Sequence, residues 1–307
     1  MKRLAEDLSS YSQYLSETDG RLIILSTYFS SKQDPVRGGF KQTDNFAYIK
    51  HWYNSVQKHD LEAVVFYDRL SEEFIQIYQT EKIRFVRCQL GGMSLNDERF
   101  FIFQEFISGL PEDCFVLTTD INDVVINKNP LPLLQAKPIK LFVGRGNRRV
   151  WKNGIWTLTA LRQFHDRFNK AIPLSFLDYP VFNPGTIAGR KDLVVALFNQ
   201  MTQIFEVLGD GRNYDMPVFN YVLKENYYPT SGFWDGKVPF SWVWNYCYYG
   251  YRLQRKLESD YRKEKYDLAF HQESVVENEK IYAGFPFVSM FGRYEEEGVS
   301  KAYLLHK

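Results

Sequence analysis

The chain has 307 residues, of which 45% are hydrophobic and 24% charged, and this composition is that of an ordinary globular protein able to bury a core. Its formal net charge of +1 gives no electrostatic reason to expect a long nucleic-acid footprint. The first 20 residues contain no apolar core of a signal peptide, and no later run reaches the roughly 18 apolar residues of a spanning helix. The cysteines are widely spaced and support neither a zinc knuckle nor a disulfide framework: Cys88, Cys114 and Cys247. We therefore expect a cytoplasmic protein without a transmembrane segment.

Strand and helix patterns alternate along the first part of the chain. Apolar runs predict four strands, over residues 21–29, 61–70, 81–90 and 113–120. Apolar residues at helical spacing predict helices over residues 43–60 and 95–110, the second of them opening on Asn96 and Asp97 as caps. This alternation predicts βαβ units around a central, mostly parallel sheet.

The fold class that we expect is α/β, with a Rossmann-like sheet in a single domain over residues 1–307. Residues 1–20 would be a lead segment, and the aromatic C-terminal part, residues 230–307, would pack on the same unit. A further strand is predicted over residues 139–146 and a long amphipathic helix over residues 191–208. Because ligands of such sheets bind beyond the carboxyl ends of the strands, residues that follow a strand are candidates for a site.

Two aspartates stand where the fourth strand should end, Asp120 and Asp123 in the sequence Thr-Asp-Ile-Asn-Asp. Carboxylates so close repel each other unless positive charge lies between them. A hard divalent ion such as Mn²⁺ or Mg²⁺ accepts carboxylate oxygens and leaves positions free for substrate phosphates. An acidic turn after a strand is also common without an ion. A dehalogenase-type phosphatase would need its second aspartate at position 122, where Asn122 stands.

A second candidate segment has the sequence VFNPGTIAGR. It is expected to place Asn183, Gly185 and Gly189 in a turn between an apolar strand and the helix over residues 191–208. Glycines in such a turn let the backbone approach a ligand closely.

Three charged residues complete the set of candidates. Asp215 precedes Pro217 at the expected first turn of a helix, where it either caps the helix or faces an acceptor. Arg37 and Arg99 are cations suited to neutralising phosphates, although surface arginines need no such role.

Seven short motifs follow one another over roughly residues 22–294: DPVRGG, WYNSV, NDERFF, LTTDINDVVINKNP, FNPGTIAG, DMPVFN and WVWNY. Their order resembles glycosyltransferases of the GT-A fold, and more narrowly a family of predicted plant, algal-virus and microbial nucleotide-sugar transferases. The aspartates of the fourth motif are also similar to the metal-binding pair in the glycosyltransferase domains of procollagen-lysine enzymes.

The resemblance implies how a nucleotide-sugar donor is held. Asp120 and Asp123 would bind Mn²⁺ or Mg²⁺ bridging the donor diphosphate, and Asp215 would be the catalytic residue beside the acceptor. The loop that follows the first strand would hold the nucleotide, and the segment around position 183 would shape the sugar pocket. The donor-binding residues expected on this basis are Thr27, Tyr28, Arg37, Arg99, Asp120, Asn183 and Gly185.

The third metal ligand departs from the family pattern. Related families often end in a strand followed by a histidine, but Ser289 occupies this position. His271 is the ligand expected instead, although a lone histidine is more often a hydrogen-bonded structural residue.

We therefore expect a metal-dependent glycosyltransferase that moves a sugar from a UDP- or GDP-linked donor to a carbohydrate or glycoconjugate acceptor. Sugar transfer to a base in nucleic acid is an alternative, motivated by the aromatic loop RRVWKNGIW and the basic residues near it. A catalytically silent carbohydrate-binding protein with the same fold is a third reading, which Ser289 motivates.

Overall fold

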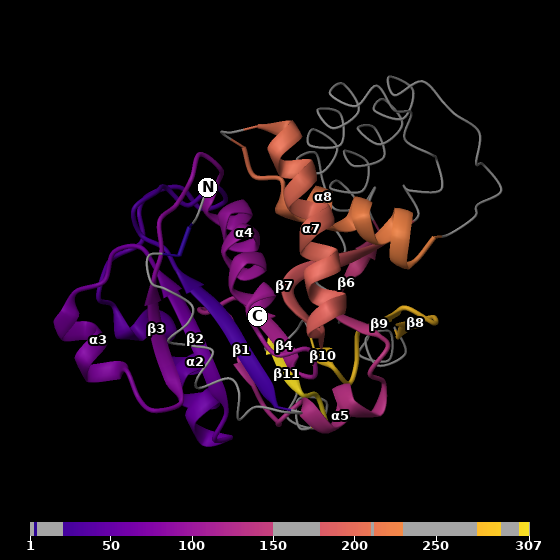
Figure 1. Ribbon diagram of the computed structural model, residues 1–307, viewed down its shortest axis with the longest axis horizontal. Coiled ribbons are helices and arrows are strands. Elements are labelled where there is room, and N and C mark those ends of the chain that lie inside the picture. The colour runs from indigo at the N-terminus through magenta and orange to yellow at the C-terminus, as the bar shows by residue number, and fades with distance from the viewer. Residues whose placement is uncertain are drawn as a thin grey trace, which may run out of the picture.

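The computed structural model describes residues 3–4, 21–149, 179–209, 212–229, 275–289 and 301–306 (Figure 1). The bounds of the helices and strands, in chain order, are β1 Leu22–Tyr28, α2 Phe46–Lys58, β2 Glu62–Tyr67, α3 Glu72–Tyr78, β3 Ile83–Arg87, α4 Leu95–Ser108, β4 Phe115–Thr119, β5 Val124–Ile126, α5 Leu131–Ala136, β6 Leu141–Arg149, β7 Pro180–Arg190, α7 Lys191–Leu208, α8 Asp215–Val222, a π-helical turn Leu223–Tyr227, β8 Val276–Glu277, β9 Ile281–Ala283, β10 Val288–Ser289 and β11 Leu304–His306. The strands and helices expected up to Asp120 are all present.

Eight strands of the described residues form one central sheet, in the order β3-β2-β1-β4-β7-β6-β9-β8. β1 pairs in parallel with β2 and β4, and β2 pairs in parallel with β3. β7 is antiparallel to both β4 and β6, so β6 and its parallel neighbour β9 run in the direction of β1. The expected α/β class with a mostly parallel central sheet is confirmed, and the carboxyl ends of β1 and β4 lie side by side.

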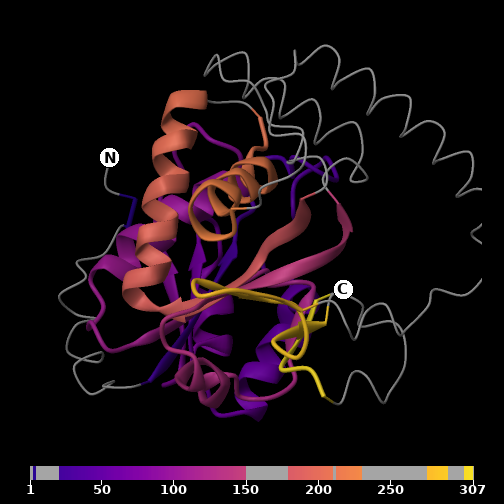
Figure 2. The same cartoon turned by 90° about the vertical axis from the view of Figure 1, so that its right-hand side faces the viewer.

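Alternate residues of β1 enter two different cores, because successive side chains of a strand point to opposite faces of the sheet. Ile23 and Leu25 belong to the core that α4, α7 and α8 cover, whereas Leu22 and Ile24 belong to the core beneath α2, α3 and α5. Figure 2 shows α7 and α8 on one side of the sheet and the purple α2 on the other. Helices on both faces explain why the parallel strands read as continuous apolar runs in the sequence.

The segment around Asn183 and Gly185 is not the turn that the sequence predicted. Pro180–Arg190 form the eleven-residue strand β7. β7 is antiparallel to β4, and Thr186 lies opposite Thr119 at the end of that strand. The pairing with β4 on one side and β6 on the other stabilises an extended conformation in spite of the glycines and the proline, which favour turns in isolation.

Two helices begin at residues other than the ones expected. The N-cap of α4 is Ser94, whose Oγ accepts from Asp97 N at 3.2 Å, so Asn96 and Asp97 are not the caps. Asp97 occupies the third position of the helix, and its carboxylate accepts from Ser94 Oγ at 2.9 Å. In α8, Tyr214 is the N-cap residue and Asp215 is the first helical residue, whose Oδ1 accepts from Met216 N at 2.7 Å.

A second, three-stranded sheet was not predicted. It has the order β10-β11-β5, in which β11 is parallel to β10 and antiparallel to β5. It ties the C-terminal residues to the segment that follows Asp123. The extent of the single domain stays a prediction, because residues 150–178 and 230–274 lie outside the described part of the chain. No helix within the described ranges is long and apolar enough to cross a membrane.

Candidate metal centre

The backbone at the end of β4 is fixed from three sides. The carbonyl of Thr119 accepts from Ser26 Oγ of β1 at 2.7 Å. The hydroxyl of Thr119 accepts from Trp52 Nε1 of α2 at 2.7 Å. The next residue, Asp120, donates its backbone N–H to Gly185 O of β7 at 2.9 Å. These contacts hold the start of the Asp120 to Asp123 turn at the carboxyl end of β4, where the sequence predicted it.

A histidine from the far end of the chain joins the two aspartates. β11 pairs with β5, which follows Asp123 directly, and thereby brings His306 to the turn. His306 Nε2 lies 3.5 Å from Asp120 Oδ2 and 3.7 Å from Asp123 Oδ1. Within the described ranges these three residues form a group whose ligand atoms all lie within 4.8 Å of one another.

The distances in this group leave room for a shared cation. The separations of 3.5 and 3.7 Å between His306 and the aspartates are too long for strong hydrogen bonds. Two ligand atoms of one octahedral ion, each bound at about 2.1 Å, lie roughly 3 to 4 Å apart. His306 is 3% exposed, and its Nδ1 has no hydrogen-bond partner in the described part of the chain. The two carboxylates suit Mg²⁺ or Mn²⁺, and the imidazole nitrogen makes Mn²⁺ the better match.

Gly185 leaves the space that this arrangement needs. A Cβ at this position would collide with Asp120 Oδ2 and with His306 Cε1, and would lie 3.0 Å from Asn183 Oδ1. The same Asn183 Oδ1 accepts from Gly185 N at 2.7 Å. The glycine is therefore required by close approach of side chains. The structure brings Asn183 and Gly185 to the aspartates, and their contact with a sugar stays a prediction.

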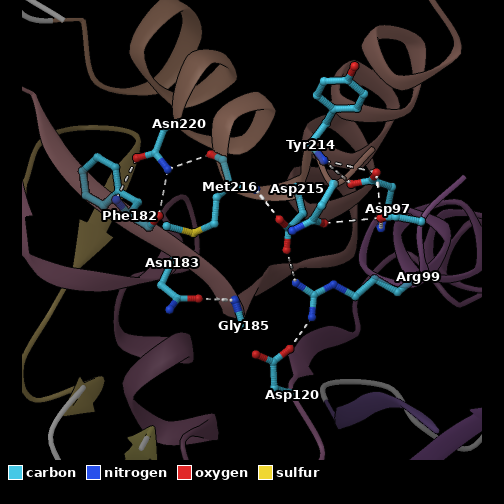
Figure 3. Close-up of polar contacts among 12 residues, drawn as sticks. Asp97, Arg99, Asp120, Phe182, Asn183, Gly185, Tyr214, Asp215, Met216 and Asn220 are labelled. Atoms are coloured by element: carbon cyan, nitrogen blue, oxygen red, sulfur yellow. Dashed lines mark hydrogen bonds and ion pairs between the residues drawn. The ribbon is translucent and has the colours of Figure 1, made fainter. Parts of the chain in front are cut away.

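Arg99 lies between two carboxylates (Figure 3). Its Nη1 pairs with Asp120 Oδ1, and its Nη2 lies 3.2 Å from Asp215 Oδ2. Burial by itself would raise the pKa of Asp120, but Arg99 and then His306 outweigh it and hold that pKa well below its ordinary value. Because Arg99 is 8% exposed and already engaged twice, its expected contact with a donor phosphate stays a prediction.

Asp215 and Asp97 are buried neighbours. Asp215 has a side-chain exposure of 7%, and burial raises its pKa although Arg99 opposes the shift. Asp97 of α4 accepts from Tyr214 N with both carboxylate oxygens, at 3.1 and 3.2 Å. Burial and the charge of Asp215 raise the pKa of Asp97 to about 8. Asp97 therefore fixes the start of α8 and with it the position of Asp215.

Asn220 joins α8 to β7 from within the core (Figure 3). Its Oδ1 accepts from Phe182 N at 2.8 Å, and its Nδ2 donates to Phe182 O at 2.9 Å and to Met216 O at 2.8 Å. Sequence reasoning did not single out this residue. The signal that was available is an amide side chain among the apolar residues of a short helix, since a buried amide must find partners.

The loop after β1 carries Arg37 to the same site. Asp34 accepts from Arg37 N at 2.9 Å, and Gly38 and Gly39 have φ values of +72° and +74°, which only glycine adopts freely. Arg37 Nη2 lies 3.7 Å from Asp123 Oδ2. The expected donor residue Arg37 therefore lies beside the candidate metal centre.

The two donor residues expected at the end of β1 differ in exposure. Thr27 is half-buried, whereas Tyr28 is fully buried. The Tyr28 hydroxyl donates to Gln42 O at 2.7 Å and accepts from Asn45 N at 3.0 Å. Tyr28 thus holds the segment that leads into α2, and the contact of either residue with a nucleotide stays a prediction.

The expected third ligand, His271, lies outside the described residues. Ser289 pairs through β10 with Leu305, the residue next to His306. His306, the histidine that reaches the aspartates, therefore lies on the strand adjacent to Ser289, where the sequence resemblance implied a histidine. The signal available in the sequence was a short apolar run ending in histidine, AYLLH, too short to predict a strand.

Comparison of the sequence with models of known protein families gives no match, and comparison with curated proteins gives no match either. The structure shows an α/β protein with a mostly parallel central sheet. At the carboxyl end of β4 it brings together two carboxylates and a histidine that could hold a metal ion.

Proposed function

We propose that the protein is a metal-dependent glycosyltransferase that moves a sugar from a UDP- or GDP-linked donor to a carbohydrate or glycoconjugate acceptor. The observation that supports this best is the meeting of Asp120, Asp123 and His306 at the carboxyl end of β4, where ligands of α/β sheets bind. The reaction type rests on the resemblance of the motif order to nucleotide-sugar transferases.

Each member of the metal centre has a separate task. A divalent ion, when bound, supplies positive charge to the leaving nucleoside diphosphate. Asp120 would hold it through Oδ2, because Oδ1 is paired with Arg99. Asp123 and His306 would supply the other two protein ligands. Arg99 keeps Asp120 ionised and fixed in orientation, as a ligand must be.

The transfer step needs a group that accepts a proton. The bond from the anomeric carbon to the phosphate oxygen breaks, and its electron pair leaves with the phosphate. A bond forms from the acceptor oxygen to the anomeric carbon, and the hydroxyl proton passes to a base. We assign this base to Asp215, because burial raises its pKa toward the range in which a carboxylate accepts protons effectively.

The donor test uses a panel of nucleotide sugars with and without Mn²⁺, followed by mass spectrometry of transfer and of donor hydrolysis. Asp120→Ala and Asp123→Ala should each lower Mn²⁺-dependent donor binding or turnover by at least about tenfold, or 1.4 kcal/mol. Asp60→Asn, an exposed carboxylate outside the site, is the matched control. Full activity of Asp123→Ala in the presence of a chelator would rule out the metal role.

Asp215→Asn separates the enzyme from a silent binder of the same fold. The amide preserves shape but cannot accept a proton, so melting and donor affinity should remain near those of the parent while transfer falls by roughly a hundredfold or more. Transfer at the parent rate would remove the base role from Asp215. Sugar binding by the parent without transfer or hydrolysis of any donor would favour the silent carbohydrate-binding protein.

A further inference from the structure

Lys41 is a cation in the segment between β1 and α2. It follows the turn that a bridge between Gln33 and Phe40 closes. The side chain is half-buried, and its Nζ lies over the ring of Tyr48, 5.2 Å from the ring centroid. Within the described part of the chain, this ammonium makes neither an ion pair nor a hydrogen bond.

The charges that act on Lys41 are those of the candidate metal centre. Burial lowers the pKa of Lys41, Asp34 and Asp120 act against this shift, and Arg99 and Arg37 add to it. Burial raises the pKa of the Tyr48 hydroxyl, and the charges of Asp120 and Asp123 raise it further. Two contacts place this segment at the carboxyl end of β1: the Tyr28 hydroxyl donates to Gln42 O at 2.7 Å, and Arg37 Nη2 lies 3.7 Å from Asp123 Oδ2.

The carboxylates of this region already have other partners. Asp34, whose charge acts most on Lys41, accepts from Val36 N at 2.8 Å and from Arg37 N at 2.9 Å. Arg99 pairs with Oδ1 of Asp120, while Oδ2 of the same residue faces His306. Arg37 lies 3.7 Å from Asp123. A half-buried ammonium without an anion is costly, so the geometry favours a ligand that brings one. A divalent ion on the aspartates would neutralise them further and increase this preference for an anion.

We propose that Lys41 binds the second phosphoryl group of a nucleoside diphosphate, the group that becomes the leaving group in sugar transfer. This inference rests on the proposed function and adds a residue to it. Lysine suits the role because its ammonium is a compact charge with three donors. The Tyr48 ring holds that charge without offering a competing anion. The consequence is selectivity: the site prefers ligands with two linked phosphoryl groups over monophosphates.

The test is calorimetric titration of the parent, Lys41→Met and Lys41→Arg with UDP, GDP, UMP, GMP and inorganic pyrophosphate in the presence of Mn²⁺, and with Mn²⁺ alone. Lys50→Met, an exposed lysine of α2, is the charge-matched control. Lys41→Met should weaken diphosphate and pyrophosphate binding by roughly ten- to a hundredfold, the loss expected for a hydrogen bond to a charged group. Monophosphate and Mn²⁺ affinities should change by less than about threefold, and Lys41→Arg should recover part of the loss.

Two results would overturn the inference. Diphosphate binding unchanged in Lys41→Met removes the contact, and an equal loss for Mn²⁺, monophosphates and diphosphates shows that Lys41 only maintains the site. Thermal unfolding of each variant identifies a folding defect. The outcomes for transfer are separate. If the protein transfers no sugar but its pyrophosphate binding depends on Lys41, the role of Lys41 is supported and the proposed function is contradicted. If Lys41→Met leaves sugar transfer unaffected, the proposed function is supported and the role of Lys41 is contradicted.

Discussion

At Gly185, the absence of a side chain lets both Asp120 and His306 approach the backbone of β7 closely. Gly185→Ala should lower Mn²⁺ affinity by about tenfold or more and the free energy of unfolding by roughly 1 to 3 kcal/mol, because the methyl group overpacks the site. Gly189→Ala on the same strand is the control: its Cβ would lie 3.3 Å from Lys140 O, so it should cost stability without changing metal affinity. Titration with Mn²⁺ and denaturant unfolding measure the two effects, and parent-like Mn²⁺ affinity of Gly185→Ala would contradict the close approach.

Asp97 predicts a pH dependence of stability. Its pKa in the folded protein is raised to about 8, against about 3.9 for an unperturbed aspartate. The stability that its proton contributes is complete below the unfolded pKa and is lost as the pH rises through about 8. Asp97→Asn resembles the protonated form, so its unfolding midpoint in denaturant should fall less between pH 5 and pH 9 than that of the parent. The pKa of Asp215 is also raised, so the Asp97→Asn variant should still lose some stability as the pH rises. Equal slopes for parent and variant would assign the dependence to other groups.

At the scale of single elements, β11 has three residues but supplies the only histidine near the aspartates in the described part of the chain. His306→Ala should lower Mn²⁺ affinity by about tenfold, because one of three protein ligands is lost. His271→Ala tests the ligand expected from the sequence, and it should bind Mn²⁺ as the parent does. Parallel titrations decide between the two residues. The reverse order of effects would show that β11 only packs against the turn.

The helices and strands also show which sequence patterns were sufficient to predict an element. Strands β1, β2 and β4 were predictable because each is largely buried and reads as a mostly apolar run, and β3 was predictable from its buried Ile83, Phe85 and Val86. β7 was predicted as a turn because Pro184 and Gly185 favour turns locally, whereas its extended form depends on pairing with β4 and β6. β5 and β11 are too short for a periodic pattern. At α4, the N-cap Ser94 lies two residues before Asn96, the first of the residues expected to cap, and the exact end of a helix is the least certain part of a sequence-based prediction.

At the scale of the whole molecule, the site combines segments that are distant in the sequence. Asp120 and Asp123 could be predicted because both follow one strand. Lys41, Asp97 and His306 could not, since each reaches the site only through sheet order and helix packing. A residue's approach to a partner in another segment depends on tertiary contacts, which local patterns do not encode.

Because the site joins β4, β7 and β11, a metal bound there should stabilise the whole chain against unfolding. The unfolded chain does not hold Asp120, Asp123 and His306 together, so the ion binds the folded state preferentially. At a Mn²⁺ concentration about 100 times Kd, the gain is about 2.7 kcal/mol, which raises Tm by several degrees in a chain of this size. Thermal unfolding with Mn²⁺ and then with excess chelator measures the rise and its reversal. Asp60→Asn should retain the rise in Tm and Asp123→Ala should lose most of it; an equal rise in both variants would mean that the ion binds elsewhere.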